Sequence, residues 1–118
     1  LLATGQLEAA QAYIDEVYAG SDDADTVAQY LYLGFREPTR TLLGAAEARA
    51  RAAITEFPQQ AARFHSAHGR LLRRMGRLEE AERAFAAAVD QAAPDSPSLG
   101  TYQGQLEFVR RELASRGS

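Results

Sequence analysis

The stretch Phe64–Pro94, FHSAHGRLLRRMGRLEEAERAFAAAVDQAAP, decides the fold. At its centre stands the hexapeptide Gly76-Arg77-Leu78-Glu79-Glu80-Ala81. On both sides of Gly76 apolar residues recur at spacings of three and four, the pattern of a helix with one buried side. Gly76 can adopt the left-handed conformation that ends a helix. The stretch therefore predicts two consecutive helices joined by a short turn.

The same spacing extends outward over the whole sequence, and no strand pattern interrupts it. Proline, glycine and short polar clusters separate the helices. We expect six helices: Leu7–Tyr18; Val27–Glu37, capped by Asp25 or Thr26; about Leu42–Phe57; Gln59–Met75 after Pro58 as first residue; Leu78–Ala92; and a last one capped by Ser96 with Pro97 as first residue. The prediction is an all-α fold.

Small residues and prolines also recur along the sequence at nearly constant distance. The pairs 35 apart are Gly34 and Gly69, Ala46 and Ala81, Ala50 and Phe85, and Ala53 and Ala88, while Pro58 and Pro94 are 36 apart. Two antiparallel helices pack closely where one side chain at the crossing is small. A recurrence of two helices every ~34 residues is the period of a helical solenoid.

On these residues the protein resembles the tetratricopeptide repeat family. Its pattern is matched by Tyr30, Leu33, Gly34, Ala46 and Pro58 in one unit, and by Gly69, Leu72, Ala81, Phe85, Ala88 and Pro94 in the next. The resemblance implies one α-solenoid domain: a half-repeat (1–22), two repeats (27–60 and 62–95) and a capping helix (96–118). Departures from the pattern are Glu37, Ala50, His65 and His68. The alternative is a helical bundle whose spacing is fortuitous.

Composition narrows the class of protein. The 118 residues suffice for one domain, and 46% apolar residues suffice for a core. A net charge of −3 argues against a dedicated nucleic-acid binder, and neither a membrane span nor a signal peptide is present in the sequence. We expect a cytoplasmic protein.

Two further features concern the origin of the sequence. All 13 basic residues are arginine and alanine is the commonest residue, which suggests a GC-rich bacterial gene. The start at Leu1 suggests a piece of a longer protein.

No arrangement of residues typical of catalysis or metal binding is evident. Cysteine is absent, and His65 and His68, three apart on one helix face, have no nearby carboxylate in sequence, so a packing role is expected for both. Ser66 lies about 100° around the helix from His65, which argues against a nucleophile–base pair. The run Glu79, Glu80 and Glu82 reads as a solvated helix start. We expect a non-enzyme with no metal and no cofactor.

The resemblance implies that the first helix of each repeat lines a concave groove that binds partner segments. Carried over, the lining consists of Ala28, Leu31, Tyr32 and Phe35 from one repeat and Arg63, Ser66, Ala67, Arg70, Arg73 and Arg74 from the next. Arginine forks suit carboxylates and aromatic side chains suit apolar anchors. The predicted partner is an acidic peptide, or a free C-terminus, bearing an apolar side chain. The alternative is that these arginines cover a solvated helix and pair with glutamates.

The function expected from the sequence is a non-catalytic protein-interaction module or scaffold. Two alternatives stay open. The module could associate with itself as a homodimer through its terminal helices. It could also be a regulatory segment of a larger bacterial enzyme or transcription factor, since Phe64–Ala93 also resembles the helical tails of some bacterial sigma factors.

Overall fold

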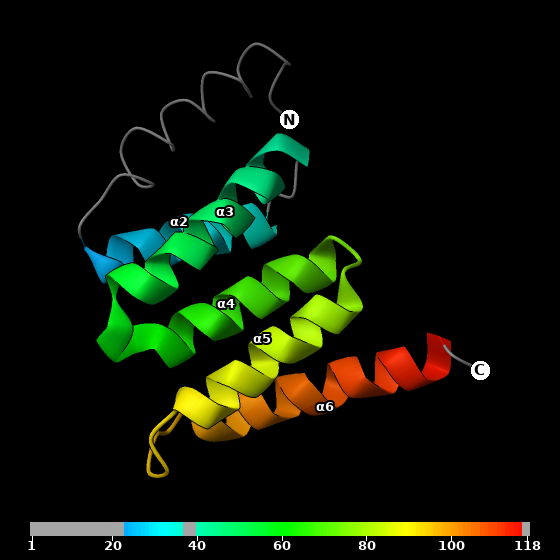
Figure 1. Ribbon diagram of the computed structural model, residues 1–118. Coiled ribbons are helices and arrows are strands. Elements are labelled where there is room, and N and C mark those ends of the chain that lie inside the picture. Colours follow the sequence, from blue (N-terminus) through cyan, green and yellow to red (C-terminus); the bar gives the residue numbers. More distant parts are fainter. Residues whose placement is uncertain (1–22, 37–39, 117–118) are drawn as a thin grey trace.

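The protein is described by a computed structural model over residues 23–36 and 40–116, with side chains described except at 29, 33–36 and 40–42 (Figure 1). All regular elements in these ranges are helical. They are α2 (Ala24–Arg36), α3 (Arg40–Glu56), the short 3-10 helix η2 (Pro58–Gln60), α4 (Ala61–Arg74), α5 (Leu78–Gln91) and α6 (Leu99–Arg116). The predicted all-α class is confirmed for this part of the protein. The helix expected over Leu7–Tyr18 lies outside the described residues, as does Glu37.

Several helices begin at residues other than those predicted. Asp23, not Asp25 or Thr26, caps α2: its Oδ2 accepts the backbone N–H of Thr26 at 3.1 Å and the Thr26 hydroxyl at 2.7 Å. The Thr26 hydrogen bonds lower the pKa of Asp23, so the cap stays ionised. Pro58 opens a single 3-10 turn instead of α4, which begins only at Ala61.

The start of α6 also differs, because the polar turn before it is longer than predicted. The Ser96 hydroxyl accepts the backbone N–H of Ser98 at 3.2 Å, which keeps Pro97 in the turn. The helix then begins at Leu99. In contrast, the turn between α4 and α5 matches the prediction, since Gly76 has a φ of +77°.

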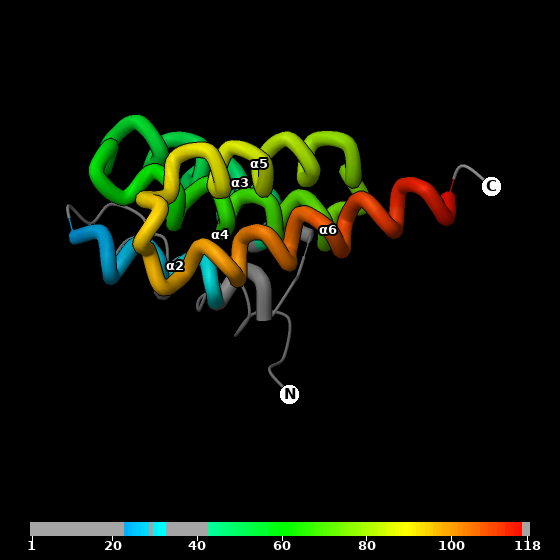
Figure 2. Tube along the Cα trace, turned by 90° about the horizontal axis from the view of Figure 1, so that it is seen from below, coloured from blue at the N-terminus to red at the C-terminus, as the bar shows by residue number. Residues whose placement is uncertain are grey.

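Successive helices pack against one another and form a slab of 41 × 37 × 20 Å. The packed neighbours are α2 with α3 and α4, α4 with α3 and α5, and α5 with α6. In the view of Figure 2, α3 and α5 lie along the upper side of the slab, and α2 and α6 lie along its lower side. None of the described helices is long and apolar enough to cross a lipid bilayer.

Two apolar cores lie within the slab, and α4 contributes to both. The first core joins α2, α3 and α4 through Ala24, Val27, Tyr30, Leu31, Ala46, Ala50, Ala53, Phe64 and Leu71. The second joins α4, α5 and α6 through Leu72, Ala81, Ala84, Phe85, Leu106 and Val109. The consecutive residues Leu71 and Leu72 therefore face different cores.

Small residues allow the close helix packing that their recurrence predicts. Ala46, Ala50 and Ala53 on α3, and Ala81 and Ala88 on α5, are fully buried. Gly69 on α4 faces the buried ring of Phe85 on α5. Because these crossings fix how α4 sits between its neighbours, they also fix the surface that α4 exposes.

Candidate functional site

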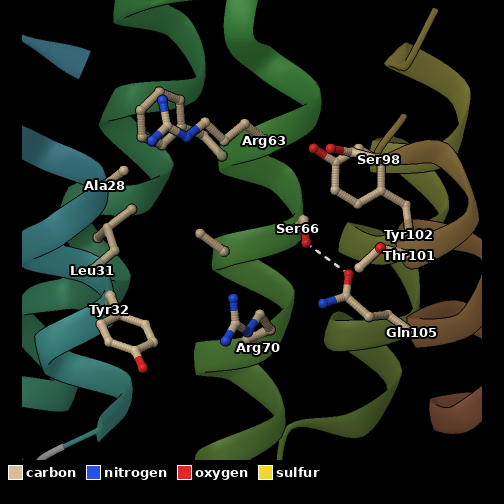
Figure 3. A pocket seen from close by; sticks show the side chains of 12 residues that line it. Ala28, Leu31, Tyr32, Arg63, Ser66, Arg70, Ser98, Thr101, Tyr102 and Gln105 are labelled. Carbon is tan, nitrogen blue, oxygen red and sulfur yellow. Dashed lines mark hydrogen bonds between the residues drawn. The ribbon is translucent and has the colours of Figure 1, made fainter. Parts of the chain in front are cut away.

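A groove of about 300 Å³ opens on one face of the slab, between α2, α4 and α6 (Figure 3). Its lining consists of Ala28, Leu31 and Tyr32 from α2; Arg63, Phe64, Ser66, Ala67 and Arg70 from α4; Thr101, Tyr102 and Gln105 from α6; and Ser98 from the turn before α6. Three helices that are separate in sequence thus share one concave surface.

The floor of the groove is a stripe on α4. Arg63, Ser66 and Arg70 follow at spacings of three and four, so they lie on one side of the helix. Nη1 of Arg63 lies 2.7 Å from Oδ1 of Asp25 and 2.8 Å from Oε1 of Gln60. The Arg63 side chain therefore links α4 to the start of α2 at one end of the groove.

A hydrogen bond joins the wall formed by α6 to the floor. The hydroxyl of Ser66, only 6% exposed, donates to Oε1 of Gln105 at 2.7 Å. With its oxygen engaged, the Gln105 amide turns its nitrogen toward the groove, whereas the guanidinium of Arg70 lies on the side of α4 nearer Tyr32 (Figure 3). Thr101 and Tyr102 continue this wall toward Ser98.

The wall formed by α2 supplies an exposed aromatic side chain. Tyr32 is 48% exposed at the rim of the groove, beside Ala28 and Leu31 (Figure 3). Leu31 itself is 2% exposed and belongs mainly to the first core, so it offers the groove only an edge. On this wall, Tyr32 therefore offers a ligand more exposed surface than Leu31 does.

Beyond the lining, the α4 stripe continues to Arg73. Its Nε lies 2.5 Å from Oε1 of Glu112, and its guanidinium lies 4.6 Å from the ring centre of Phe108, both on α6. Phe108 is 50% exposed. Arg73 thus ties α4 to α6, as the alternative of arginine–glutamate pairing expected.

The structure brings together seven of the groove residues expected from the sequence: Ala28, Leu31, Tyr32, Arg63, Ser66, Ala67 and Arg70. Arg73 and the exposed Arg74 lie outside the lining, nearer the C-terminal end of α4. Phe35 lies in α2, but its side chain is outside the described part of the structure.

Sequence reasoning missed the contribution of α6, whose Thr101, Tyr102 and Gln105 line the groove. A signal was present: Thr101, Gln105, Phe108 and Glu112 follow at spacings of four, three and four, beside the apolar stripe of the same helix. This second stripe is the one that faces α4.

On α3, a buried carboxylate joins three elements. Glu47 is 7% exposed, and its Oε2 lies 2.6 Å from Nε of Arg51 and 2.8 Å from Nε2 of His68. Its Oε1 lies 3.5 Å from Nη1 of Arg77, in the turn before α5. His68 therefore has the carboxylate partner that its own helix does not offer, and its role in the fold is structural.

The pKa of Glu47 reflects two opposing effects. Burial raises it, but the hydrogen bonds from His68 and Arg51, together with their positive charge, lower the pKa below the ordinary value of 4.5. The interactions of this carboxylate therefore stabilise the fold above pH 4.5, and that stabilisation is lost as the pH falls through the lowered pKa.

The run of glutamates at the start of α5 is paired, not merely solvated as predicted. Glu79 pairs with Arg116, Glu80 with Arg77 and Glu82 with Arg110. Two of these pairs connect α5 to α6, so the run serves the packing of neighbouring helices. Within the described ranges no group of three or more potential metal-ligating side chains occurs.

In comparisons with known proteins, no family model, no curated protein and no solved structure matches the sequence.

Proposed function

We propose that the protein is a non-catalytic protein-interaction module, built as a solenoid of the tetratricopeptide type, that binds a segment of a partner protein in the groove between α2, α4 and α6. The solenoid is supported by the packing of each helix on the next and by the face that α2, α4 and α6 share. It is also supported by the buried small residues that recur 35 positions apart, such as Ala46 and Ala81.

One observation carries the binding proposal: three helices wall a single groove with an exposed Tyr32 at its rim and arginine side chains on its floor. Aromatic and arginine side chains are the residue types that dominate binding energy at protein interfaces. Because the groove is open along α4, an extended or helical segment suits it better than a small, enclosed ligand.

The proposal is tested by filling the groove. In the variant Thr101→Trp, an exposed lining residue of α6 becomes an indole that occupies the groove. In the matched control Gln103→Trp, the same indole is placed two residues further along α6, at an exposed position outside the lining. We expect the parent and Gln103→Trp to bind the same members of an array of ten-residue peptides, and Thr101→Trp to lose at least ~10-fold in affinity.

Equal binding by both tryptophan variants, or no binding by the parent protein, would contradict groove recognition.

Self-association is a second candidate, because the ring of Phe108 on α6 is half exposed where it lies beside Arg73 of α4. Light scattering between 5 and 500 µM, roughly the range in which weak dimers form, distinguishes it. A mass that doubles with concentration in the parent protein, and stays monomeric in Phe108→Ser, would favour self-association through α6. A constant monomer mass would exclude it.

A further inference from the structure

A second hollow of about 300 Å³ lies between α3, α4 and α5, on the side of the slab that carries α3 and α5 (Figure 2). Its lining consists of Ile54 from α3; His65, His68 and Leu72 from α4; and Glu80, Arg83, Ala84 and Ala87 from α5. The second hollow shares no lining residue with the groove. Its chemistry can therefore be considered independently of the groove.

His65 brings a ring without a hydrogen-bond partner to the second hollow. Its side chain forms no hydrogen bond or ion pair with any described residue. In the described ranges no fully buried polar side-chain atom lacks a partner, so the ring nitrogens of His65 are accessible. Burial, followed by the positive charge of His68, lowers the pKa of His65 below 6.5, and the ring is therefore chiefly neutral at pH 7. A neutral imidazole can donate one hydrogen bond to a ligand.

Arg83 brings a guanidinium to the same hollow from α5. It is exposed, and it forms no hydrogen bond or ion pair with any described residue. Glu79 and Glu80 act on it through charge alone, and their carboxylates are paired with Arg116 and Arg77. The N–H donors of Arg83 are therefore available to a ligand.

The other two polar side chains of the lining are held by neighbouring groups. Nε2 of His68 lies 2.8 Å from Oε2 of Glu47, and Oε2 of Glu80 lies 2.5 Å from Nη2 of Arg77. Because Arg77 also lies 3.5 Å from Glu47, one network fixes both side chains. Glu80 thus presents no unpaired negative charge to an anion bound by Arg83.

The rest of the lining is apolar. It consists of Ile54, Leu72, Ala84 and Ala87. Leu72 is 2% exposed and belongs to the second core, so the apolar surface of the hollow is continuous with a rigid part of the molecule. Ligand sites typically combine such apolar surface with a few polar groups that fix the orientation of the ligand.

The two available polar groups suit a carboxylate. A carboxylate accepts from a guanidinium and from an imidazole N–H at the same time. Arg83 supplies one positive charge and His65 supplies none at pH 7, so the charge to be balanced is single. A phosphate monoester carries about −1.5 to −2 at this pH and would bring surplus negative charge next to Glu80. The hollow therefore favours a monoanion.

We infer that the second hollow is a binding site for a small monocarboxylate with an apolar body, whose carboxylate accepts from Arg83 and His65 and whose apolar part packs on Ile54 and Leu72. This site goes beyond the proposed function, because it lies outside the groove and takes a small molecule instead of a protein segment.

The test titrates the 118-residue protein with phenylacetate and follows the ring-proton NMR signals of its two histidines, which are assigned with His65→Gln. Phenylacetamide is the control that keeps the ring without the charge, and acetate is the control that keeps the charge without the ring. We expect phenylacetate to shift the His65 signals with a dissociation constant at least ~10-fold lower than that of either control. A ligand of this size is expected to bind in the millimolar range.

One variant assigns the carboxylate to its cation. Arg83→Gln removes an exposed guanidinium that pairs with no described residue, so the fold should persist, and phenylacetate and phenylacetamide should then bind equally. Arg111→Gln is the matched control: it removes the same charge from the exposed surface of α6, outside the lining, and should keep the full preference for phenylacetate.

Three results would overturn the inference: no shift of the His65 signals, equal dissociation constants for phenylacetate and phenylacetamide in the parent protein, or a preference for phenylacetate that survives in Arg83→Gln. Each of them leaves the proposed function standing, because Thr101→Trp tests the groove at residues that the second hollow does not contain.

Discussion

A Cβ atom at position 69 would lie 2.7 Å from Cδ1 and Cε1 of Phe85, closer than non-bonded carbon atoms approach. The two helices α4 and α5 therefore meet where α4 has no side chain. Phe85 is almost fully buried in the second core, so its ring has little freedom to move aside.

The variant Gly69→Ala should destabilise the protein. Overpacking a core costs about 1–3 kcal/mol, and the better helix propensity of alanine offsets about 1 kcal/mol of that. We expect the free energy of unfolding, measured by urea titration, to fall. Gly104→Ala is the control, because a Cβ at that position of α6 meets no atom within 4 Å. It should raise stability by about 0.5–1 kcal/mol, and a similar gain in Gly69→Ala would contradict the close contact.

The buried carboxylate of Glu47 should matter more than an exposed one on the same helix. Glu47→Ala leaves His68, Arg51 and Arg77 without their shared acceptor, and we expect a loss of about 1–3 kcal/mol in unfolding free energy. Glu56→Ala removes an ion pair with Arg49 near the surface, which is worth at most about 1 kcal/mol. Equal losses in the two variants would show that the connections made by Glu47 add nothing to stability.

Stability should also depend on pH through His65. Burial, followed by the nearby positive charge of His68, lowers the pKa of His65 below its ordinary value of 6.5. The unfolded state then binds protons more readily, so stability falls as the pH drops below 6.5 toward the lowered pKa. The urea midpoint should therefore be lower at pH 5.5 than at pH 7.5, about one unit on either side of that value.

His65→Gln isolates this effect, because His68 is then the one histidine left in the sequence. The difference between the two midpoints should shrink in the variant. An unchanged difference would show that His65 does not cause the pH dependence.

Much of the fold could be predicted from the sequence because the patterns that determine its helices are local. Spacings of three and four placed five described helices, and the recurrence of alanine and Gly69 located the close crossings. The predicted first residue of a helix was wrong where a single hydrogen bond determines the helix start, as at Asp23 and Ser96. At such boundaries a neighbouring polar side chain could form an equivalent hydrogen bond, and the sequence alone does not show which of them forms.

The candidate site was predictable only in part. The lining residues of α2 and α4 were predicted from the resemblance to tetratricopeptide repeats, but the place of Gln105 depends on how α6 is rotated about its axis. That rotation is fixed by contacts such as the one with Ser66, 39 residues away in sequence. The partner of His68 was missed for the same reason, since Glu47 lies 21 residues earlier on a different helix.

The two apolar cores have a consequence for how the molecule opens. Since Leu71 and Leu72 turn α4 toward different cores, α6 and then α5 can detach while the contacts among α2, α3 and α4 persist. If the protein is a solenoid, as proposed above, such fraying from one end is expected, because each unit of a solenoid contacts only its neighbours. Amide hydrogen exchange would then be slowest in α4 and fastest in α6. The wall that carries Gln105 would be the first part of the groove to open.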